Sequence, residues 1–192
     1  MNASGASILA NPHPCGHIVY PYTDEGLLGQ AVSLFTSAGL RDGDGVILII
    51  SADHCESIKL RLQLEGINPE AYEATGQLVF VMAEDLLRTF VPNGTLDEQV
   101  FTTTVADLIT RTKQSATPAR RVRVFGEMVS ELRTNDPAAT TRLEELWNDV
   151  VKEHAVSLLC TYALHHAGDS IPAALIHLHT ANIERDVAIS ST

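Results

Sequence analysis

The stretch HIVYPYTDEGLLGQAV, residues 17–32, decides the fold of this chain, because it reads as a buried strand that turns directly into a helix. In a doubly wound nucleotide-binding domain, the first such turn carries a glycine-rich loop that binds phosphate. Here the turn is Pro21-Tyr22-Thr23-Asp24-Glu25, which has two carboxylates and no Gly-Lys-Ser/Thr. The sequence therefore predicts this architecture with aromatic and acidic groups at the phosphate position.

The rest of the chain continues the alternation of strand and helix. Unbroken runs of valine, isoleucine and leucine are typical of strands covered on both faces, and apolar residues three and four apart predict helices between them. Helices are expected to begin at caps near Asp24, Asp53, Thr95 and Asp136. Strands are expected at residues 18–22, 46–50, 78–82, 122–125 and 155–162. This pattern predicts an α/β fold, a three-layer sandwich with a mostly parallel central sheet.

The chain divides into a short lead-in and one domain. Residues 1–16 are expected to be disordered, and residues 17–192 to form a single domain. Pro172 is expected to start a terminal helix that runs to about residue 187 and shows a partial apolar stripe. Such a stripe could pack on the sheet or on a second copy of the chain, so a homo-oligomer is one expectation.

The composition argues against several kinds of partner. The 192 residues include 13 basic and 24 acidic ones, and the formal net charge of −11 disfavours nucleic acid and anionic membranes. The cluster Arg120-Arg121-x-Arg123 is interpreted as a solvated strand edge. No apolar run approaches the roughly 20 residues that span a bilayer, and the first residues make a poor secretory signal. Three widely spaced cysteines without a C-x-x-C pair indicate reduced thiols, so we expect a cytoplasmic protein.

Candidate ligand-binding residues lie near the ends of the predicted strands, because open α/β sheets bind ligands outside the carboxyl ends of their strands. Aromatic and sulfur-containing side chains could form the walls of an apolar pocket, with His17 and Glu127 as polar anchors. In an active ATPase, an acidic residue at the position of Glu127 would prepare a water molecule for attack. The predicted ligand-binding residues are His17, Tyr20, Tyr22, Glu127, Met128, Cys160 and Tyr162.

Structural alternatives apply to most of these residues. His17 either touches a ligand or is hydrogen-bonded to a nearby backbone carbonyl. Met128 and Cys160 are more typical of core residues than of pocket walls, and Trp147 on the helix that follows Pro137 is typical of a core or an interface. Asp24 and Glu25 favour the helix N-terminus through its dipole rather than catalysis.

Neither a metal site, a cofactor nor a catalytic group is predicted. His13, Cys15 and His17 alternate along the chain, but the proline and glycine between them disfavour a regular strand, and a fourth ligand would have to come from elsewhere. His177 and His179, if helical, would point to different sides. No Ser-His-Asp arrangement or nucleophile elbow is visible.

Five segments carry a resemblance to a known family: HIVYPYTDE, AGLRDGDGVILIISADH, GQLVFVMAEDLL, VRVFGEMVSEL and RLEELWNDVVKEHAVSLLCTYAL. From residue 17 to about residue 164, the chain resembles the MEDS domain, named for methanogen/methylotroph DcmR-type sensory proteins. The resemblance implies a RecA/KaiC-like fold without the phosphate loop, or Walker A motif, and without ATPase activity. It also implies a sensory module for small hydrocarbon derivatives that works with a histidine kinase, an anti-sigma factor or a transcription regulator.

Three functions therefore compete. The first is a non-enzymatic sensory domain that binds a small, largely apolar ligand and regulates a partner protein. The second is a degenerate nucleotide-binding, ATPase-like protein, whose characteristic GxxxxGK[ST] motif is missing. The third is a pure interaction module of an anti-sigma or histidine-kinase circuit. The chain shows no kinase or helix-turn-helix motif, so its output would pass through a separate protein.

Overall fold

A parallel sheet forms the centre of the molecule. The computed structural model describes residues 1, 3–115, 119–129, 137–164 and 169–183. Within these residues, six strands form one sheet in the order β3-β2-β4-β5-β1-β6, and all neighbouring strands run parallel. The strands are β1 (His17–Tyr22), β2 (Gly45–Ile50), β3 (Leu78–Met82), β4 (Val122–Gly126), β5 (Ser157–Ala163) and β6 (Ala181–Asn182). The predicted α/β fold with a parallel central sheet is confirmed.

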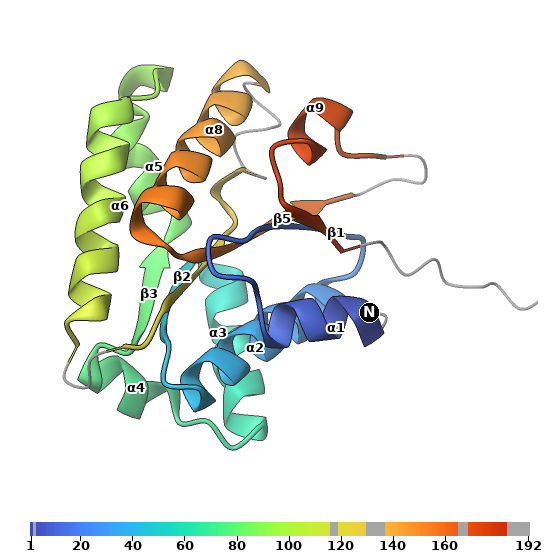
Figure 1. The fold of residues 1–192 in the computed structure, drawn as a ribbon, viewed down its shortest axis with the longest axis vertical. Coiled ribbons are helices and arrows are strands. Elements are labelled where there is room, and N and C mark those ends of the chain that lie inside the picture. The colour runs from blue at the N-terminus through green and yellow to red at the C-terminus, as the bar shows by residue number, and fades with distance from the viewer. Residues whose placement is uncertain (2, 116–118, 130–136, 165–168, 184–192) are drawn as a thin grey trace, which may run out of the picture.

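Helices cover both faces of this sheet and complete the three layers (Figure 1). One core lies between the sheet and α1, α2 and α3, and the other between the sheet and α5, α6 and α8. The helices are α1 (Ala3–Ala10), α2 (Glu25–Arg41), α3 (Ala52–Leu64), α4 (Pro69–Thr75), α5 (Ala83–Phe90), α6 (Glu98–Lys113), α8 (Pro137–His154) and α9 (Ala173–Ile176), with a 3₁₀ turn, η1, at Pro92–Gly94.

The two cores follow from the alternation of side chains along each strand. Every residue of β2 is buried, and its side chains divide between the two cores. Along β1, Val19 packs into the core on the α8 side of the sheet, the α8 core. Tyr20 and Tyr22 pack into the core on the α2 side, the α2 core. Strand β1 therefore contributes to both sides of the sheet.

Helix caps agree with the sequence at some positions and differ at others. The Asp24 side chain caps α2, as expected. Helix α6 is capped by Asp97 rather than by Thr95, because the Asp97 carboxylate accepts a hydrogen bond from Val100 N at 3.0 Å. Ser51 rather than Asp53 occupies the N-cap position of α3. The short helices α4 and α5 were not predicted.

The first residues form helix α1, where the sequence predicted a disordered lead-in over residues 1–16. Helix α1 packs on α2 and buries Leu9 completely. Arg123 donates hydrogen bonds to the carbonyl oxygens of Leu9 and Ala10 at 3.3 and 3.1 Å, and to the carboxylate of Asp44 at 2.8 Å. The arginine is therefore buried, not part of a solvated strand edge, because all three guanidinium nitrogens find hydrogen-bond acceptors in the protein.

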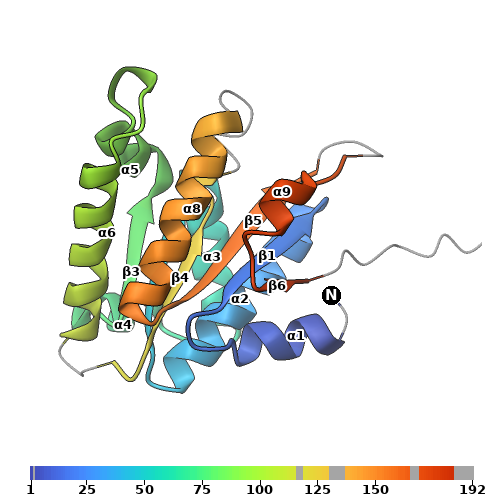
Figure 2. The ribbon, with the colours of Figure 1, turned by 45° about the horizontal axis from the view of Figure 1, so that its top comes forward.

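The C-terminal segment also differs from its prediction. Instead of a helix over residues 172–187, the structure has the four-residue α9 and then β6, which lies beside β1 (Figure 2). Residues 184–187 of the predicted helix lie outside the described residues. The N–H groups of Thr180 and Ile183 donate to β1 carbonyls at 2.7 and 3.0 Å. Hydrogen bonding to the backbone of β1 stabilises this segment more than a helix with a weak apolar stripe would.

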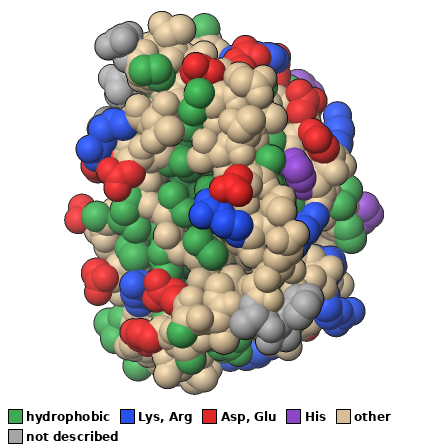
Figure 3. All heavy atoms as spheres, turned by 90° about the vertical axis from the view of Figure 1, so that its left-hand side faces the viewer, with side chains coloured by type: hydrophobic (Ala, Val, Ile, Leu, Met, Phe, Trp, Pro, Cys, Tyr) green, Lys and Arg blue, Asp and Glu red, His purple; other side chains and the backbone are tan. Residues whose placement is uncertain are grey.

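The opposite edge of the sheet is strand β3. Its residues from Val79 to Met82 are only partly buried, and the Lys59 ammonium lies 4.7 Å from the centre of the Phe80 ring. On the face beyond this edge, apolar side chains alternate with acidic and basic ones (Figure 3). Charged groups beside an open edge discourage pairing with another strand. Among the described helices, none has the length and apolar character needed to cross a membrane.

Candidate functional site

The junction of β1 and α2 holds a carboxylate where a nucleotide-binding protein would hold phosphate. Only Thr23 and Asp24 separate the strand from the helix. The Asp24 side chain accepts a hydrogen bond from Leu27 N at 3.1 Å, and Glu25 stands in the first helical turn. An N-terminal helix end attracts anions through its free N–H groups and its dipole. Here the protein's own carboxylates occupy that position.

A second acidic group lies at the neighbouring strand ends. Glu127 accepts hydrogen bonds from Ser51 N at 2.7 Å and from His54 Nδ1 at 2.5 Å. His54 Nε2 lies 2.7 Å from a Glu25 carboxylate oxygen. The hydrogen bond with Glu127 raises the pKa of His54 to about 9, burial opposes this shift, and the Glu25 charge adds to it. An imidazolium between two carboxylates therefore closes this part of the edge.

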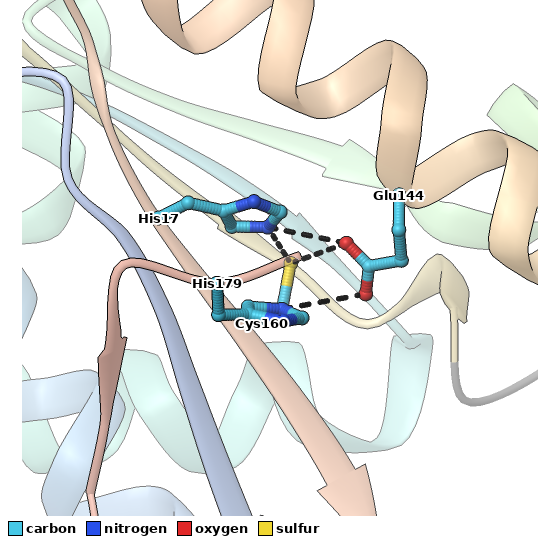
Figure 4. Close-up of side chains that lie close together, drawn as sticks. All are labelled: His17, Glu144, Cys160 and His179. Atoms are coloured by element: carbon cyan, nitrogen blue, oxygen red, sulfur yellow. Dashed lines mark hydrogen bonds and ion pairs between the residues drawn. The ribbon is translucent and has the colours of Figure 1, made fainter. Parts of the chain in front are cut away.

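A buried polar cluster lies on the α8 side of the sheet. We call it the His-Cys-Glu cluster; its members are His17 of β1, Glu144 of α8, Cys160 of β5 and His179, which follows α9. Their side chains point toward one another (Figure 4). Their potential ligand atoms all lie within 4.8 Å of one another. Tyr162 donates a hydrogen bond to Glu144 Oε1.

The distances within the cluster are short. His17 Nε2 lies 3.1 Å from Glu144 Oε2 and 3.3 Å from Cys160 Sγ. Cys160 Sγ is 3.8 Å from Glu144 Oε2, and His179 Nε2 is 3.6 Å from Glu144 Oε1. The two imidazole rings are 4.1 Å apart between centroids. The side chains of both histidines and of Glu144 have no exposed surface.

Partners outside the cluster hold the two imidazole rings. His17 Nδ1 lies 3.1 Å from Asn148 Oδ1, and the Asn148 amide donates to the Leu178 carbonyl at 2.9 Å. His179 Nδ1 lies 2.8 Å from the Leu175 carbonyl of α9. The Nε2 atoms of both rings therefore face the centre of the cluster.

Burial governs the protonation of this cluster. Burial lowers the pKa of His179 to about 4, although the Glu144 charge opposes the shift. Burial, with the Glu144 charge, raises the pKa of the Cys160 thiol well above its usual value. For Glu144, burial acts to raise the pKa, but the His17 hydrogen bond, the histidine charges and the Tyr162 hydroxyl outweigh it and lower the pKa. Carboxylate, thiol and imidazole are groups that bind transition metals.

The seven predicted ligand-binding residues do not share one pocket. His17, Cys160 and Tyr162 meet in or beside the cluster, and Met128 is buried in the same core. Tyr20 and Tyr22 lie in the opposite core. Glu127 is at the strand ends with His54.

Some alternatives considered for single residues can now be judged. The His17 ring contacts side chains of two other elements, α8 and β5, rather than a backbone carbonyl. Trp147 is buried in the α8 core, where it packs edge-on against Phe101 with ring centroids 5.2 Å apart. His179 lies beyond the end of α9 and is turned inward, so the helical geometry assumed for it was wrong.

Sequence reasoning missed Glu144 and His179. Glu144 lies on an amphipathic helix, where a glutamate is normally assigned to the solvent-exposed face. Its burial depends on partners from distant elements. One usable signal was the spacing of Glu144 and Asn148, two polar residues four apart that flank the apolar stripe. The sequence around His179 offered no comparable pattern.

A cavity of about 250 Å³ opens at the carboxyl end of the β1 edge. It lies where β1, β5 and β6 end, and its walls come from those ends and from α9. The lining residues are Pro21, Leu164, Ile171 and Ile176, with Asp169, Ser170 and Asn182 as polar members.

Comparison with known structures and families agrees with this architecture. The structure resembles a KaiC-like protein from the hyperthermophilic archaeon Pyrococcus horikoshii OT3, with a TM-score of 0.56 and 12% sequence identity over 91% of this chain and 76% of that one. At this identity the likeness shows a KaiC-like RecA fold and nothing further. A search of curated proteins found no match. Residues 16–180 match the family described as MEDS, the MEthanogen/methylotroph, DcmR Sensory domain, and the chain belongs to this family.

Proposed function

We propose that this protein is a non-enzymatic sensory domain that binds a small, largely apolar molecule at the carboxyl ends of β1, β5 and β6. The observation that carries the proposal is that, among the described residues, this end of the sheet has an apolar cavity and no phosphate site. The phosphate position is filled by the Asp24 cap, and an apolar-walled cavity opens where β1, β5 and β6 end. Membership in a sensory family supports the same function.

The dimensions and chemistry of the cavity suit a small neutral ligand. Its volume of about 250 Å³ is near the lower end of the range of roughly 300–1,000 Å³ for ligand pockets. Proline, leucine and isoleucine side chains supply most of the wall, and Ser170 and Asn182 can orient one polar group of the ligand. Hydrocarbon derivatives such as alcohols or halogenated hydrocarbons have this character.

Helix α9 can connect the cavity to the interior. Ile176 lines the cavity, and the Leu175 carbonyl, one residue earlier, holds His179 in the His-Cys-Glu cluster. A ligand that favours one position of α9 would shift the population of the cluster's arrangements. The signal would then pass to a partner protein, for which a histidine kinase, an anti-sigma factor or a transcription regulator is proposed. The three free cysteines fit a reducing, cytoplasmic setting.

A thermal-shift screen tests this function. Alcohols, short fatty acids, aromatics and halogenated hydrocarbons are added to the purified protein, with ATP and Mg²⁺ as a separate sample. A ligand at a hundredfold excess over its Kd adds about 2.7 kcal/mol to the free energy of unfolding. For a domain of this size, the melting temperature should rise by roughly 5–11 °C. ATP should neither shift the melting temperature nor be hydrolysed.

A pair of variants locates the ligand. Ile176→Asn places an amide in the cavity wall and should abolish the shift. Leu64→Asn makes the same kind of change at an exposed leucine of α3 and should preserve it. A shift that survives Ile176→Asn would exclude this cavity. ATP turnover that disappears in Glu127→Gln would overturn the non-enzymatic function itself.

A further inference from the structure

The His-Cys-Glu cluster gathers four potential metal-ligand atoms at its centre. Asn148 donates its Nδ2 protons to the Leu178 carbonyl, so its Oδ1 atom is the acceptor that faces His17 Nδ1. His17 Nδ1 is therefore the ring nitrogen that donates its N–H to Asn148, and Nε2 is the nitrogen available to a metal ion. The Leu175 carbonyl fixes His179 in the same tautomer. The Nε2 atoms of both rings thus face a carboxylate and a thiol sulfur.

One of these atoms has no hydrogen-bond partner. His179 Nε2 is buried, and among the described residues nothing donates to it. The nearest polar atom is Glu144 Oε1 at 3.6 Å, which is itself an acceptor. Burying an acceptor without a donor is costly. A cation placed between these atoms would satisfy both of them.

The spacing of the four groups fits such a cation. In a tetrahedral zinc site, bonds of about 2.05 Å to nitrogen and about 2.3 Å to sulfur place ligand atoms roughly 3.3–3.6 Å apart. The separations here are 3.1 and 3.3 Å from His17 Nε2 to Glu144 and Cys160, 3.6 Å from His179 to Glu144, and 3.8 Å from Cys160 to Glu144. Small side-chain movements would bring all four atoms to bonding distance.

The charge and the surroundings also fit. A divalent ion bound by the Glu144 carboxylate and the Cys160 thiolate has no net charge, which a buried site requires. Each histidine donates a hydrogen bond from its Nδ1–H, His17 to the Asn148 amide oxygen and His179 to the Leu175 carbonyl, as metal-bound histidines usually do with their second ring nitrogen. Mixed nitrogen and sulfur ligands select zinc and similar transition metals over Mg²⁺ or Ca²⁺.

We propose that His17, Glu144, Cys160 and His179 bind one divalent transition-metal ion, with Zn²⁺ as its reference, in a site separate from the strand-end cavity. On binding, the Cys160 thiol loses its proton to solvent and the thiolate sulfur bonds to the metal. The ion then joins β1, α8, β5 and the segment after α9. Four protein ligands complete a tetrahedral shell, as in structural zinc sites.

Metal titration of tag-free protein tests this site. After dialysis against a chelator, Zn²⁺ is titrated in competition with a chromophoric chelator, and Co²⁺ is added to a parallel sample. We expect one equivalent of Zn²⁺, a rise in melting temperature, and a thiolate-to-cobalt charge-transfer band in the near ultraviolet. Cys160→Ser should remove the band, and His179→Ala should weaken zinc binding by more than about a hundredfold. Asn148→Ala, which frees the His17 ring, should weaken it by roughly 10–100-fold.

His177→Ala is the matched control, because this exposed histidine lies in the same segment two residues away. It should bind Zn²⁺ as tightly as the unchanged protein. Wild-type protein that takes up no stoichiometric metal overturns the proposal. So does zinc binding that persists in both Cys160→Ser and His179→Ala, since surface groups would then hold the ion. Circular dichroism of each variant verifies that it is folded.

Discussion

At the scale of single residues, two histidines show how surroundings set a proton. His54 lies between Glu127 and Glu25, and its pKa is raised to about 9. His179 is buried and has one carboxylate at 3.6 Å, so burial dominates and its pKa falls to about 4. At neutral pH the first histidine is a cation and the second is neutral. One can hold carboxylates together, and the other can offer a lone pair.

The raised pKa of His54 predicts how stability varies with pH. A pKa of about 9 in the folded state, against 6.5 when unfolded, means that the charged histidine stabilises the fold fully below pH 6.5. This contribution is lost as the pH rises through about 9. Because the ring is partly exposed to solvent, we expect a loss of about 1–2 kcal/mol in the free energy of unfolding. Urea denaturation from pH 6 to pH 10 measures it.

His54→Gln separates this histidine from other titrating groups. The variant keeps a hydrogen-bonding side chain but has no proton to lose, so its stability should vary less over the same pH window. Equal pH slopes for the variant and the wild-type protein would show that His54 contributes nothing to the pH dependence.

At the scale of elements, the sequence was most informative where strand-favouring residues follow one another. Strands β1 to β4 begin and end close to their predicted bounds, because their valine, isoleucine and aromatic residues favour strands. The two-residue β6 has no pattern of its own, and its pairing is decided by the open side of β1. Local sequence cannot encode that choice.

The residues of the candidate site also fall into those that the sequence identified and those that it missed. His17, Cys160 and Tyr162 were identified because they lie on predicted strands beside family motifs. Glu144 and His179 come from a helix and a loop, and only the packing of α8 and α9 over β1 and β5 brings them in. Polar residues are found from sequence when their element is predicted correctly and its buried face includes them. For Glu144 the helix was predicted, but its buried face was not expected to include this residue. For His179 the element itself was predicted wrongly.

The buried hydrogen bonds of Arg123 connect several elements, so their loss should destabilise the protein. This side chain of β4 is 1% exposed and joins Asp44 to the end of α1. Arg123→Met should destabilise the protein by about 3–5 kcal/mol, because it leaves the buried Asp44 carboxylate without its main partner. Chemical denaturation measures the loss. Replacing both residues, as in Arg123→Met with Asp44→Leu, should recover a large part of it.

Arg120→Met is the control for this prediction. The Arg120 side chain is exposed and donates to the Asp42 carbonyl at 3.3 Å, so its loss should change stability by no more than about 0.5 kcal/mol. If the two single variants were equally stable, the buried network would be unimportant to the fold.

At the scale of the whole molecule, residues 169–183 close one side of the sheet. They supply α9, β6, His179 and most of the cavity wall. A chain that ends at residue 168 would expose the backbone edge of β1, so we expect a lower melting temperature and a larger species in solution. Thermal melting and size-exclusion chromatography measure both effects. A chain that ends at residue 183 retains β6 and is the control.

The outcome distinguishes two roles for this segment. Equal melting and equal size for the two shortened chains would mean that residues 169–183 are dispensable for the fold. If self-association instead disappears with the segment, the segment belongs to an interface between copies, as the sequence first suggested.

The two-residue junction between β1 and α2 also limits how this protein can evolve or be engineered. A GxxxxGK[ST] motif spans eight positions, and most of them must wrap around phosphate before the helix is under way. Here Thr23 and Asp24 alone connect the strand to the helix. No series of point substitutions can create a loop of that length, so a phosphate loop of this kind would require an insertion as well. Single substitutions in the cavity walls can therefore change the shape of the cavity without creating a phosphate loop.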